Sequence, residues 1–325
     1  MLQTTWTRLL GLRVPIQLAA LPFHGVPDLA LAVADAGGLA MIGLPLHPPD
    51  AVTHVLDVMT SRTAGVFGVN FLMPFLDRDC LRIAAARARV IEFFYGEPDR
   101  ALIDLAHTGG ALAAWQVGSL AEGVAAADAG CDFVVAQGVE AGGHVRGRIG
   151  LLTLLGQLLD NVRCPVVAAG GIGSARQLAA VLATGAGGAR MGTRFLAARE
   201  ANVHPRYLEQ LLAANAEDTV LTEVFSAGWP NAPHRVLRRS VEAAAALGSG
   251  AVGTMPTPQG PFEIPCFGVV SPTRETTGNV EAMALYAGES VAAIERVEPA
   301  ATIIRDLVAG AEALLTAAHA EVHSA

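Results

Sequence analysis

The chain has 325 residues, of which 52% are hydrophobic and 16% charged, and its formal net charge at pH 7 is -8. The length exceeds what a single core usually needs, so we expect one large domain and a smaller one. The acidic balance argues against a nucleic acid or an anionic membrane as partner. All 22 strongly basic residues are arginine, which excludes Schiff-base chemistry on lysine.

Four cysteines are present and none forms a CxxC pair. We therefore expect reduced, mostly buried thiols in a cytoplasmic protein. The N-terminal region shows no basic stretch followed by an apolar one, so no signal peptide is expected. Apolar runs are interrupted well before the roughly 18 residues that a membrane helix needs, which predicts a soluble protein without a membrane partner.

Apolar segments of strand length alternate with segments of helical pattern from residue 14 to residue 191. Eight such repeats predict a (β/α)8 TIM barrel. A doubly wound sheet is the competing architecture, but no glycine fingerprint follows the first strand, where a dinucleotide fold needs one. The expected strands are 14–20, 39–44, 65–71, 90–95, 111–116, 133–136, 164–169 and 188–191, and the helices between them are 27–36, 49–60, 77–89, 99–107, 119–128, 151–159 and 174–184.

The pattern changes after residue 195. A helix is expected at 205–216, and the chain from there to 279 reads as irregular, with many glycines and prolines. We interpret residues 200–279 as a small lid or substrate domain, inserted into a barrel domain of residues 1–199 plus 280–325. Amphipathic helices at 280–294 and 300–320 would return the chain to the barrel.

Glycines gather in the loops after the seventh and eighth strands, as Gly170, Gly171 and Gly192, the last followed by Thr193. In a barrel these two loops commonly form a phosphate site. Backbone N–H groups and the start of the helix at Ser174 would supply the donors. The alternative is that the glycines only permit tight turns.

Three side-chain amides stand at the carboxyl ends of strands three, five and six: Asn70, Gln116 and Gln137. A barrel directs such positions toward its ligand. Three amides together suit a neutral heterocycle with donors and acceptors, such as a flavin ring. The alternative is that each amide caps its strand by bonding to the backbone.

His144 ends a glycine-rich loop after the sixth strand and is the side chain there that titrates near neutral pH. We expect a catalytic role, as general base or electrostatic partner. A metal site is not expected, because no other ligand lies nearby at metal spacing. Arg146 either attracts an anion or lies in water, and Glu140 is interpreted as structural or solvated. His24 receives slight weight, whereas His234 has no comparable context.

Several motifs resemble the nitronate monooxygenase family, formerly called 2-nitropropane dioxygenases. The resemblance covers nearly the whole chain and is weakest at 196–260. The central motif is VAQGVEAGGH, ending at His144, and further matches are AGGI at 169–172, MGTRF at 191–195, FGVN at 67–70, QVGS at 116–119 and YAGES at 286–290.

This resemblance implies an FMN-binding barrel with a mainly helical cap domain and His144 as the catalytic histidine. It also implies oxidation of alkyl nitronates by O2 to a carbonyl compound and nitrite, with neutral nitroalkanes first deprotonated by His144. FMN phosphate would lie on Gly171, Gly192 and Thr193, and its ring against Ala20, Leu21, Asn70, Gln116, Gln137 and Gly143.

The chain departs from some family members in ways that concern the substrate. Residues 18–23 read LAALPF where some members carry methionines, Gln116 replaces a lysine, and Glu289 stands where glutamine is frequent. Two other functions stay open: an NAD(P)H-dependent FMN reductase acting on quinones or enoyl thioesters, and a flavin-free barrel isomerase or binding protein for a phosphorylated metabolite. An alanine-rich helical surface permits a homodimer.

Overall fold

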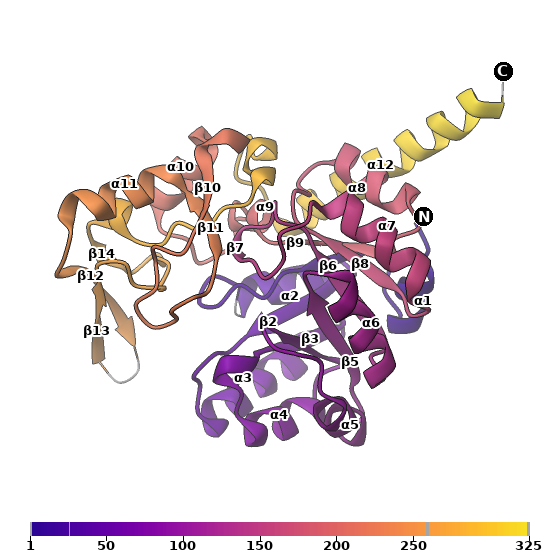
Figure 1. Cartoon of the computed structure of the whole chain (residues 1–325), viewed down its shortest axis with the longest axis horizontal. Helices are drawn as coiled ribbons and strands as arrows, with labels where there is room; N and C mark the ends of the chain where they lie inside the picture. Colours follow the sequence, from indigo (N-terminus) through magenta and orange to yellow (C-terminus); the bar gives the residue numbers. More distant parts are fainter. Residues whose placement is uncertain (1, 26, 258–259, 324–325) are drawn as a thin grey trace.

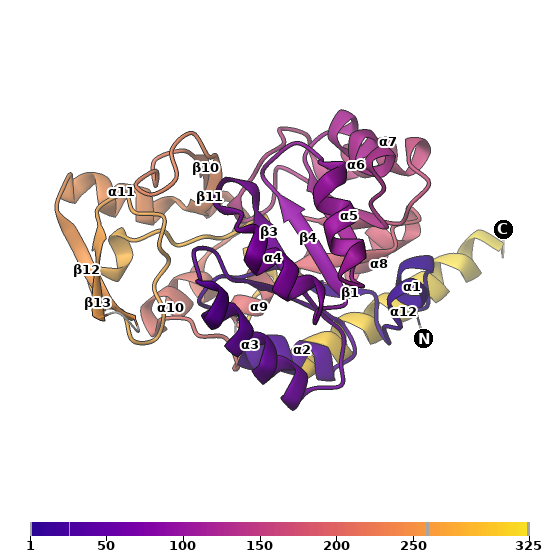
Figure 2. The same ribbon diagram turned by 90° about the horizontal axis from the view of Figure 1, so that it is seen from below.

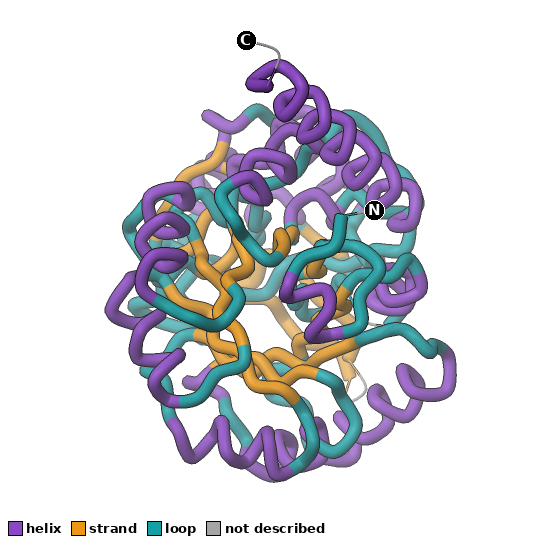
Figure 3. Tube along the Cα trace, turned by 90° about the vertical axis from the view of Figure 1, so that its right-hand side faces the viewer, coloured by secondary structure: helices purple, strands orange, loops and turns teal. Residues whose placement is uncertain are grey.

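The computed structural model describes residues 2–25, 27–257 and 260–323. Eight parallel strands close into a barrel, and helices cover its outside (Figure 1, Figure 2). Viewed from one end of the molecule, the strands lie inside a ring of helices (Figure 3). The predicted (β/α)8 fold is confirmed. The barrel strands are β1 (Ile16–Leu18), β2 (Leu39–Gly43), β3 (Phe67–Leu72), β4 (Val90–Phe94), β5 (Leu112–Val117), β6 (Phe133–Gln137), β8 (Val166–Ala169) and β9 (Gly188–Met191).

The outer helices begin where the sequence offers side-chain caps. Asp77, Asp99, Ser119 and Ser174 each accept a hydrogen bond from a backbone N–H of the first turn, which satisfies a donor that the helix cannot. The long last helix packs against α8 and α2 and completes the ring. The helices are α2 (Asp28–Asp35), α3 (Pro49–Arg62), α4 (Arg78–Ala85), α5 (Arg100–Thr108), α6 (Leu120–Ala129), α7 (Leu151–Asn161), α8 (Ala175–Ala183), α9 (Thr193–Leu196) and α12 (Ala300–His323).

The amino end of the barrel is filled by Trp6, from the short helix α1 (Thr5–Leu10), which the sequence pattern did not predict. Its ring meets Phe133 edge-on, with centroids 5.9 Å apart. A Cβ added to Gly187 or Gly188 would lie 2.6 or 2.7 Å from Trp6. Two glycines therefore allow the indole to enter the barrel, where buried apolar side chains of the strands pack around it.

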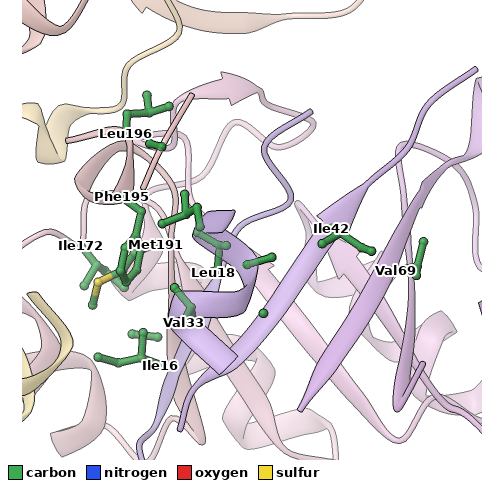
Figure 4. Close-up of a cluster of buried hydrophobic side chains, with 14 of the residues drawn as sticks. Ile16, Leu18, Val33, Ile42, Val69, Ile172, Met191, Phe195 and Leu196 are labelled. Carbon is green, nitrogen blue, oxygen red and sulfur yellow. The ribbon is translucent and has the colours of Figure 1, made fainter. Parts of the chain in front are cut away.

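The outward faces of the strands form a second apolar layer against the helices. Ile16 and Leu18 of β1 and Met191 of β9 lie near Val33 of α2 and Phe195 of α9 (Figure 4). Strands buried on both faces read as continuous apolar runs, which is why the pattern along the chain revealed them.

The segment after α9 lies beside the barrel (Figure 1). Two three-stranded sheets occur in or next to it, with orders β10-β11-β7 and β13-β12-β14. The expectation that 217–279 is irregular is wrong, and the described cap elements mix strands with helices, so the segment is not mainly helical. Its elements are α10 (Pro205–Ala213), β10 (Thr219–Thr222), β11 (His234–Leu237), α11 (Arg238–Leu247), β12 (Ala251–Thr257), β13 (Gly260–Pro265) and β14 (Thr277–Gly278), and β7 (Gly143–His144) joins the first sheet from the barrel.

The helix predicted at 280–294 is also not formed. Two short 3-10 turns, Val280–Ala282 and Glu289–Ala293, flank an extended stretch. That stretch hydrogen-bonds to β11, through Leu237 N–H to the Leu285 carbonyl and Ala287 N–H to the Arg235 carbonyl. Pairing with a distant strand therefore overrides the local helical pattern.

The four cysteines are free thiols, three of them buried, as expected. Among the described residues, no helix combines the length and the apolar character needed to cross a bilayer. The division into a barrel domain of 1–199 plus 280–325 and a cap domain of 200–279 stays a prediction.

Candidate active site

The three predicted amides lie inside the barrel mouth and are buried. Gln116 and Gln137 follow the inward-facing Ala114 and Val135 by two residues, so they point to the same face. The carbonyl oxygen of the Gln116 side chain is buried without a hydrogen-bond partner in the described structure. It is therefore available to a ligand that donates a hydrogen bond.

Gln137 is already engaged by the loop that carries the histidine. Its Nε2 donates to the His144 carbonyl at 2.9 Å, and its Oε1 accepts from Arg146 N–H at 3.2 Å. This is the backbone-capping role that the sequence left open for such amides. Gln137 therefore fixes the position of His144 relative to the barrel.

Asn70 belongs to a buried polar network that the sequence pattern did not predict. Glu92 of β4 is fully buried and accepts hydrogen bonds from Asn70 Nδ2 and Gln17 Nε2, each at 2.8 Å. Arg190 of β9 forms an ion pair with the same carboxylate. The sequence offered one sign of this network, which is the charged residue Glu92 at an inward position of the otherwise apolar strand β4.

His144 lies on β7, which pairs with β11 of the cap so that His144 stands opposite His234. Aromatic rings surround its imidazole. Trp229 stacks on it with centroids 4.0 Å apart and planes at 26°, and Tyr95, Tyr286 and His234 lie at 6.0, 5.6 and 5.5 Å. These four residues come from three segments, since Trp229 and His234 lie five residues apart, and their place at the histidine was not predicted; His234, for which the sequence offered no context, stands beside His144.

Burial determines the protonation of both histidines. Desolvation, with a contribution from His234, lowers the pKa of His144 to about 3. Its Nε2 is buried without a partner in the described part of the chain. His234 binds the Ala232 carbonyl through Nδ1 at 2.8 Å and accepts from Phe225 N–H at Nε2, so it is neutral with its proton on Nδ1. Burial lowers the pKa of His234 as well.

Glycines shape the backbone around the histidine loop. Gly143, Gly170 and Gly171 have φ of 75°, 106° and 67°, in the left-handed region that favours glycine. A Cβ on Gly143 would meet nothing within 4 Å, whereas one on Gly192 would lie 3.5 Å from Leu21 Cδ2. Gly143 thus faces open space, and the loop after β1, which carries Leu21, lies beside Gly192.

Donors for an anion come from the start of α9 more than from α8. Gln177 Oε1 already accepts from Gly173 N–H at 2.9 Å and Ser174 N–H at 3.0 Å, so these two groups are not free for a phosphate. Gly192 is the N-cap of α9 and Thr193 its first residue, and the first N–H groups of a helix have no partner within it. Thr193 Oγ1 also accepts from Gly288 N–H at 3.0 Å.

Other charged candidates have structural partners. Arg146 forms ion pairs with Glu97 and Glu122 and lies over the Tyr95 ring. Glu140 accepts from Leu151 N–H at 2.9 and 3.1 Å and caps α7, which confirms its structural interpretation.

His24 is buried beside Tyr207 of α10. It bonds to the Asn202 carbonyl through Nδ1 and packs edge-on against Tyr207. Burial lowers the pKa of His24 to about 4.

Three loops at the barrel mouth contain a bulky residue in the left-handed region. Phe23, Leu46 and Tyr95 have φ of 66°, 61° and 68° and follow β1, β2 and β4. Such conformations are costly for large side chains and gather at functional sites. They mark the same end of the barrel as the amides and His144.

The model of the family described as nitronate monooxygenase matches residues 76–310. A (3aS,4S,5R,7aS)-5-hydroxy-7a-methyl-1-oxo-octahydro-1H-indene-4-carboxyl-CoA dehydrogenase from Rhodococcus jostii is 31% identical over 245 residues, which cover 73% of this chain and 66% of that relative. A probable nitronate monooxygenase from Staphylococcus aureus is 28% identical over 267 residues, covering 68% of this chain and 75% of the relative.

Solved structures extend the likeness over the whole chain. FabK from Thermotoga maritima superimposes with a TM-score of 0.84 at 28% identity, covering 99% of this chain and 100% of the other. Nitroalkane oxidase from Streptomyces ansochromogenes gives a TM-score of 0.78 at 27% identity, covering 96% and 100%. With the family model matching most of its length, the chain belongs to the nitronate monooxygenase family and is an oxidoreductase.

Proposed function

We propose that the protein is an FMN-dependent nitronate monooxygenase, oxidising alkyl nitronates with O2 to a carbonyl compound and nitrite. The observation that carries this proposal is His144 at the mouth of the barrel: a neutral, half-buried imidazole whose buried Nε2 has no partner in the described structure. Family membership supports the reaction class.

The residues at the barrel mouth fit FMN. Gln116 offers a buried acceptor without a partner in the described structure, and Gly143 leaves open space beside the loop. The start of α9 offers donors to a phosphate. We propose that the phosphate is held by Gly170, Gly171, Gly192 and Thr193, and the ring by Ala20, Leu21, Asn70, Gln116, Gln137 and Gly143.

FMN, when bound, supplies the electron transfer and the reaction with O2. The chain positions the substrate and excludes water. Trp229, Tyr95 and Tyr286 enclose His144, so polar interactions there are stronger than in water. A neutral imidazole can bond to a nitronate oxygen, but a group whose pKa is lowered to about 3 is a weak base. The site therefore favours substrates that arrive already ionised.

Mixing the FMN-loaded protein anaerobically with an alkyl nitronate tests this proposal. We expect the visible absorbance of oxidised flavin to be lost, and nitrite to appear once air is admitted. A flavin spectrum that the nitronate leaves unchanged would contradict the proposed reaction. Failure of the protein to bind added FMN would refute the proposed cofactor.

A second candidate is an NAD(P)H-dependent FMN reductase acting on quinones or enoyl thioesters. The likeness to a dehydrogenase named for a CoA thioester favours it. Hydride transfer needs no base, which also suits a neutral His144. Rapid loss of flavin absorbance with NADPH, and its return on adding a quinone or an enoyl thioester, would identify this activity.

The small-molecule substrate and O2 are the partners that the proposal requires. A cytoplasmic location and a homodimer stay expectations. Size-exclusion chromatography with light scattering would measure the oligomeric state.

A further inference from the structure

The interior of the barrel has two unlike layers. Near the amino end, inward positions are apolar and pack on Trp6. One step nearer the mouth they include Gln17, Glu92 and Arg190, all buried. An apolar filling would serve the fold as well, because replacing a buried ion pair by well-packed apolar residues is often neutral or stabilising. The polar layer therefore calls for an explanation other than stability.

Glu92 determines how Asn70 is oriented. An amide can present either its NH2 group or its oxygen to a neighbour, but a carboxylate paired with Arg190 only accepts hydrogen bonds. Asn70 must turn its NH2 group to Glu92 Oε1, where the distance is 2.8 Å. The carbonyl oxygen of Asn70 is then the atom left for a ligand at the mouth.

Arg190 makes this arrangement possible. It pairs in register with Gln17 and Ala169 and precedes Gly192 by two residues. Its one ion pair among the described residues is with Glu92. The guanidinium supplies the opposite charge to the buried carboxylate, which would otherwise be an unpaired charge inside the barrel.

We propose that Glu92 is a positioning residue for the bound flavin, holding Asn70 so that its carbonyl oxygen accepts a hydrogen bond from the ring. The inference rests on the proposed FMN cofactor. An oxidised flavin ring has a single N–H group, in its pyrimidine part, and that group is the donor that Asn70 would recognise.

The test measures the dissociation constant of FMN from the apoprotein by quenching of flavin fluorescence. Asn70→Ala is made in three backgrounds: the natural chain, Glu92→Gln, and the double variant Glu92→Met with Arg190→Met. The double variant replaces the whole ion pair by apolar side chains, so no unpaired charge is left to prevent folding. Thermal unfolding of each apoprotein checks that it is folded.

Glu92→Gln is the conservative variant. Its side-chain oxygen can still accept from Asn70 and Arg190, and its NH2 group can donate to the Gln17 side-chain oxygen, which has no partner in the described structure. We expect FMN to bind this variant within about threefold of the natural chain, and the apolar double variant about tenfold more weakly. Asn70→Ala should weaken binding about tenfold in the natural and Glu92→Gln backgrounds, and less than about twofold in the apolar one.

An equal effect of Asn70→Ala in all three backgrounds would overturn the inference, because Glu92 would then not act through Asn70. Equal loss in Glu92→Gln and in the apolar variant would overturn it too, since charge would matter rather than orientation. Natural protein that fails to bind FMN would refute the proposed cofactor as well, and is thus distinguishable from both outcomes.

Discussion

The protonation of His144 governs what its side chain can do. Burial and the neighbouring His234 lower its pKa to about 3, so the imidazole stays neutral from about pH 5 to pH 8. With a substrate that is already ionised, we expect kcat/KM to show no inflection from this group in that range. The measurement is kcat/KM with a nitronate at pH values across this range. An inflection that is present in the natural chain and absent in His144→Asn would contradict the neutral state assigned to His144.

The same side chain should separate two classes of substrate. If the protein is a nitronate monooxygenase, His144→Asn removes the base that a neutral nitroalkane needs, and general-base effects are about 10²–10⁴-fold. Because the lowered pKa makes His144 a weak base, we expect turnover of the nitroalkane to fall by about 10²-fold, the lower end of that range, while the nitronate is spared. Parallel assays of nitrite release measure both, and equal loss for the two substrates would exclude a base.

Of the residues around the site, the sequence predicted those that are neighbours in the chain. His144 and the glycines around it stand together after a strand, so their context could be recognised. Trp229, Tyr95 and Tyr286 meet the imidazole only through folding. Tyr286 begins the YAGES motif, which gave the ring no role, and nothing in the neighbourhoods of Trp229 and Tyr95 marks them.

Among the elements, the histidine loop packs closely against the segment that follows Tyr286. A Cβ on Gly142 would lie 2.3 Å from the Gly288 backbone nitrogen, which cannot move aside as a flexible side chain can. We expect Gly142→Ala to lower the free energy of unfolding by about 1–3 kcal/mol and to weaken FMN binding. Thermal unfolding and FMN titration measure the two effects.

Gly156 offers the matched control. It lies in α7, and a Cβ there meets nothing within 4 Å. Gly156→Ala should stabilise the protein by about 0.5–1 kcal/mol, with FMN binding unchanged. Similar melting temperatures for the two variants would show that the loop has room to adjust.

The elements also differ in how visible they are in the sequence. The barrel strands were found because most of their residues are apolar and helical segments lie between them. The cap strands β10 and β11 have four residues each, and β11 pairs with β7, which lies far earlier in the chain. Prolines in β12 and β13 hid a hairpin, since proline is excluded from strand interiors but tolerated at edges.

For the whole molecule, buried neutral histidines predict sensitivity to acid. The pKa of His24 is lowered to about 4, that of His144 to about 3, and that of His234 is lowered too, all chiefly by burial. In the unfolded chain each would titrate near its ordinary value, so the unfolded state takes up protons first as the pH falls. Their contribution to stability is complete above about pH 6.5 and is lost progressively below it.

The expected loss at pH 5 is about 2 kcal/mol for His24 alone. Thermal unfolding between about pH 7.5 and pH 5 measures it, and His24→Gln, which keeps a donor for the Asn202 carbonyl, should flatten the dependence. An unchanged slope in this variant would show that other titrating groups, not His24, control the acid response.

The pairing of β7 with β11 makes the two parts of the chain interdependent. Two residues of the barrel loop, Gly143 and His144, are strand partners of Arg235 and His234 in the cap. If the cap were exchanged between relatives to alter substrate range, the strand that pairs with His144 would come from another protein. Chimaeras of this scaffold should therefore take the histidine loop and the β10–β11 pair from the same parent.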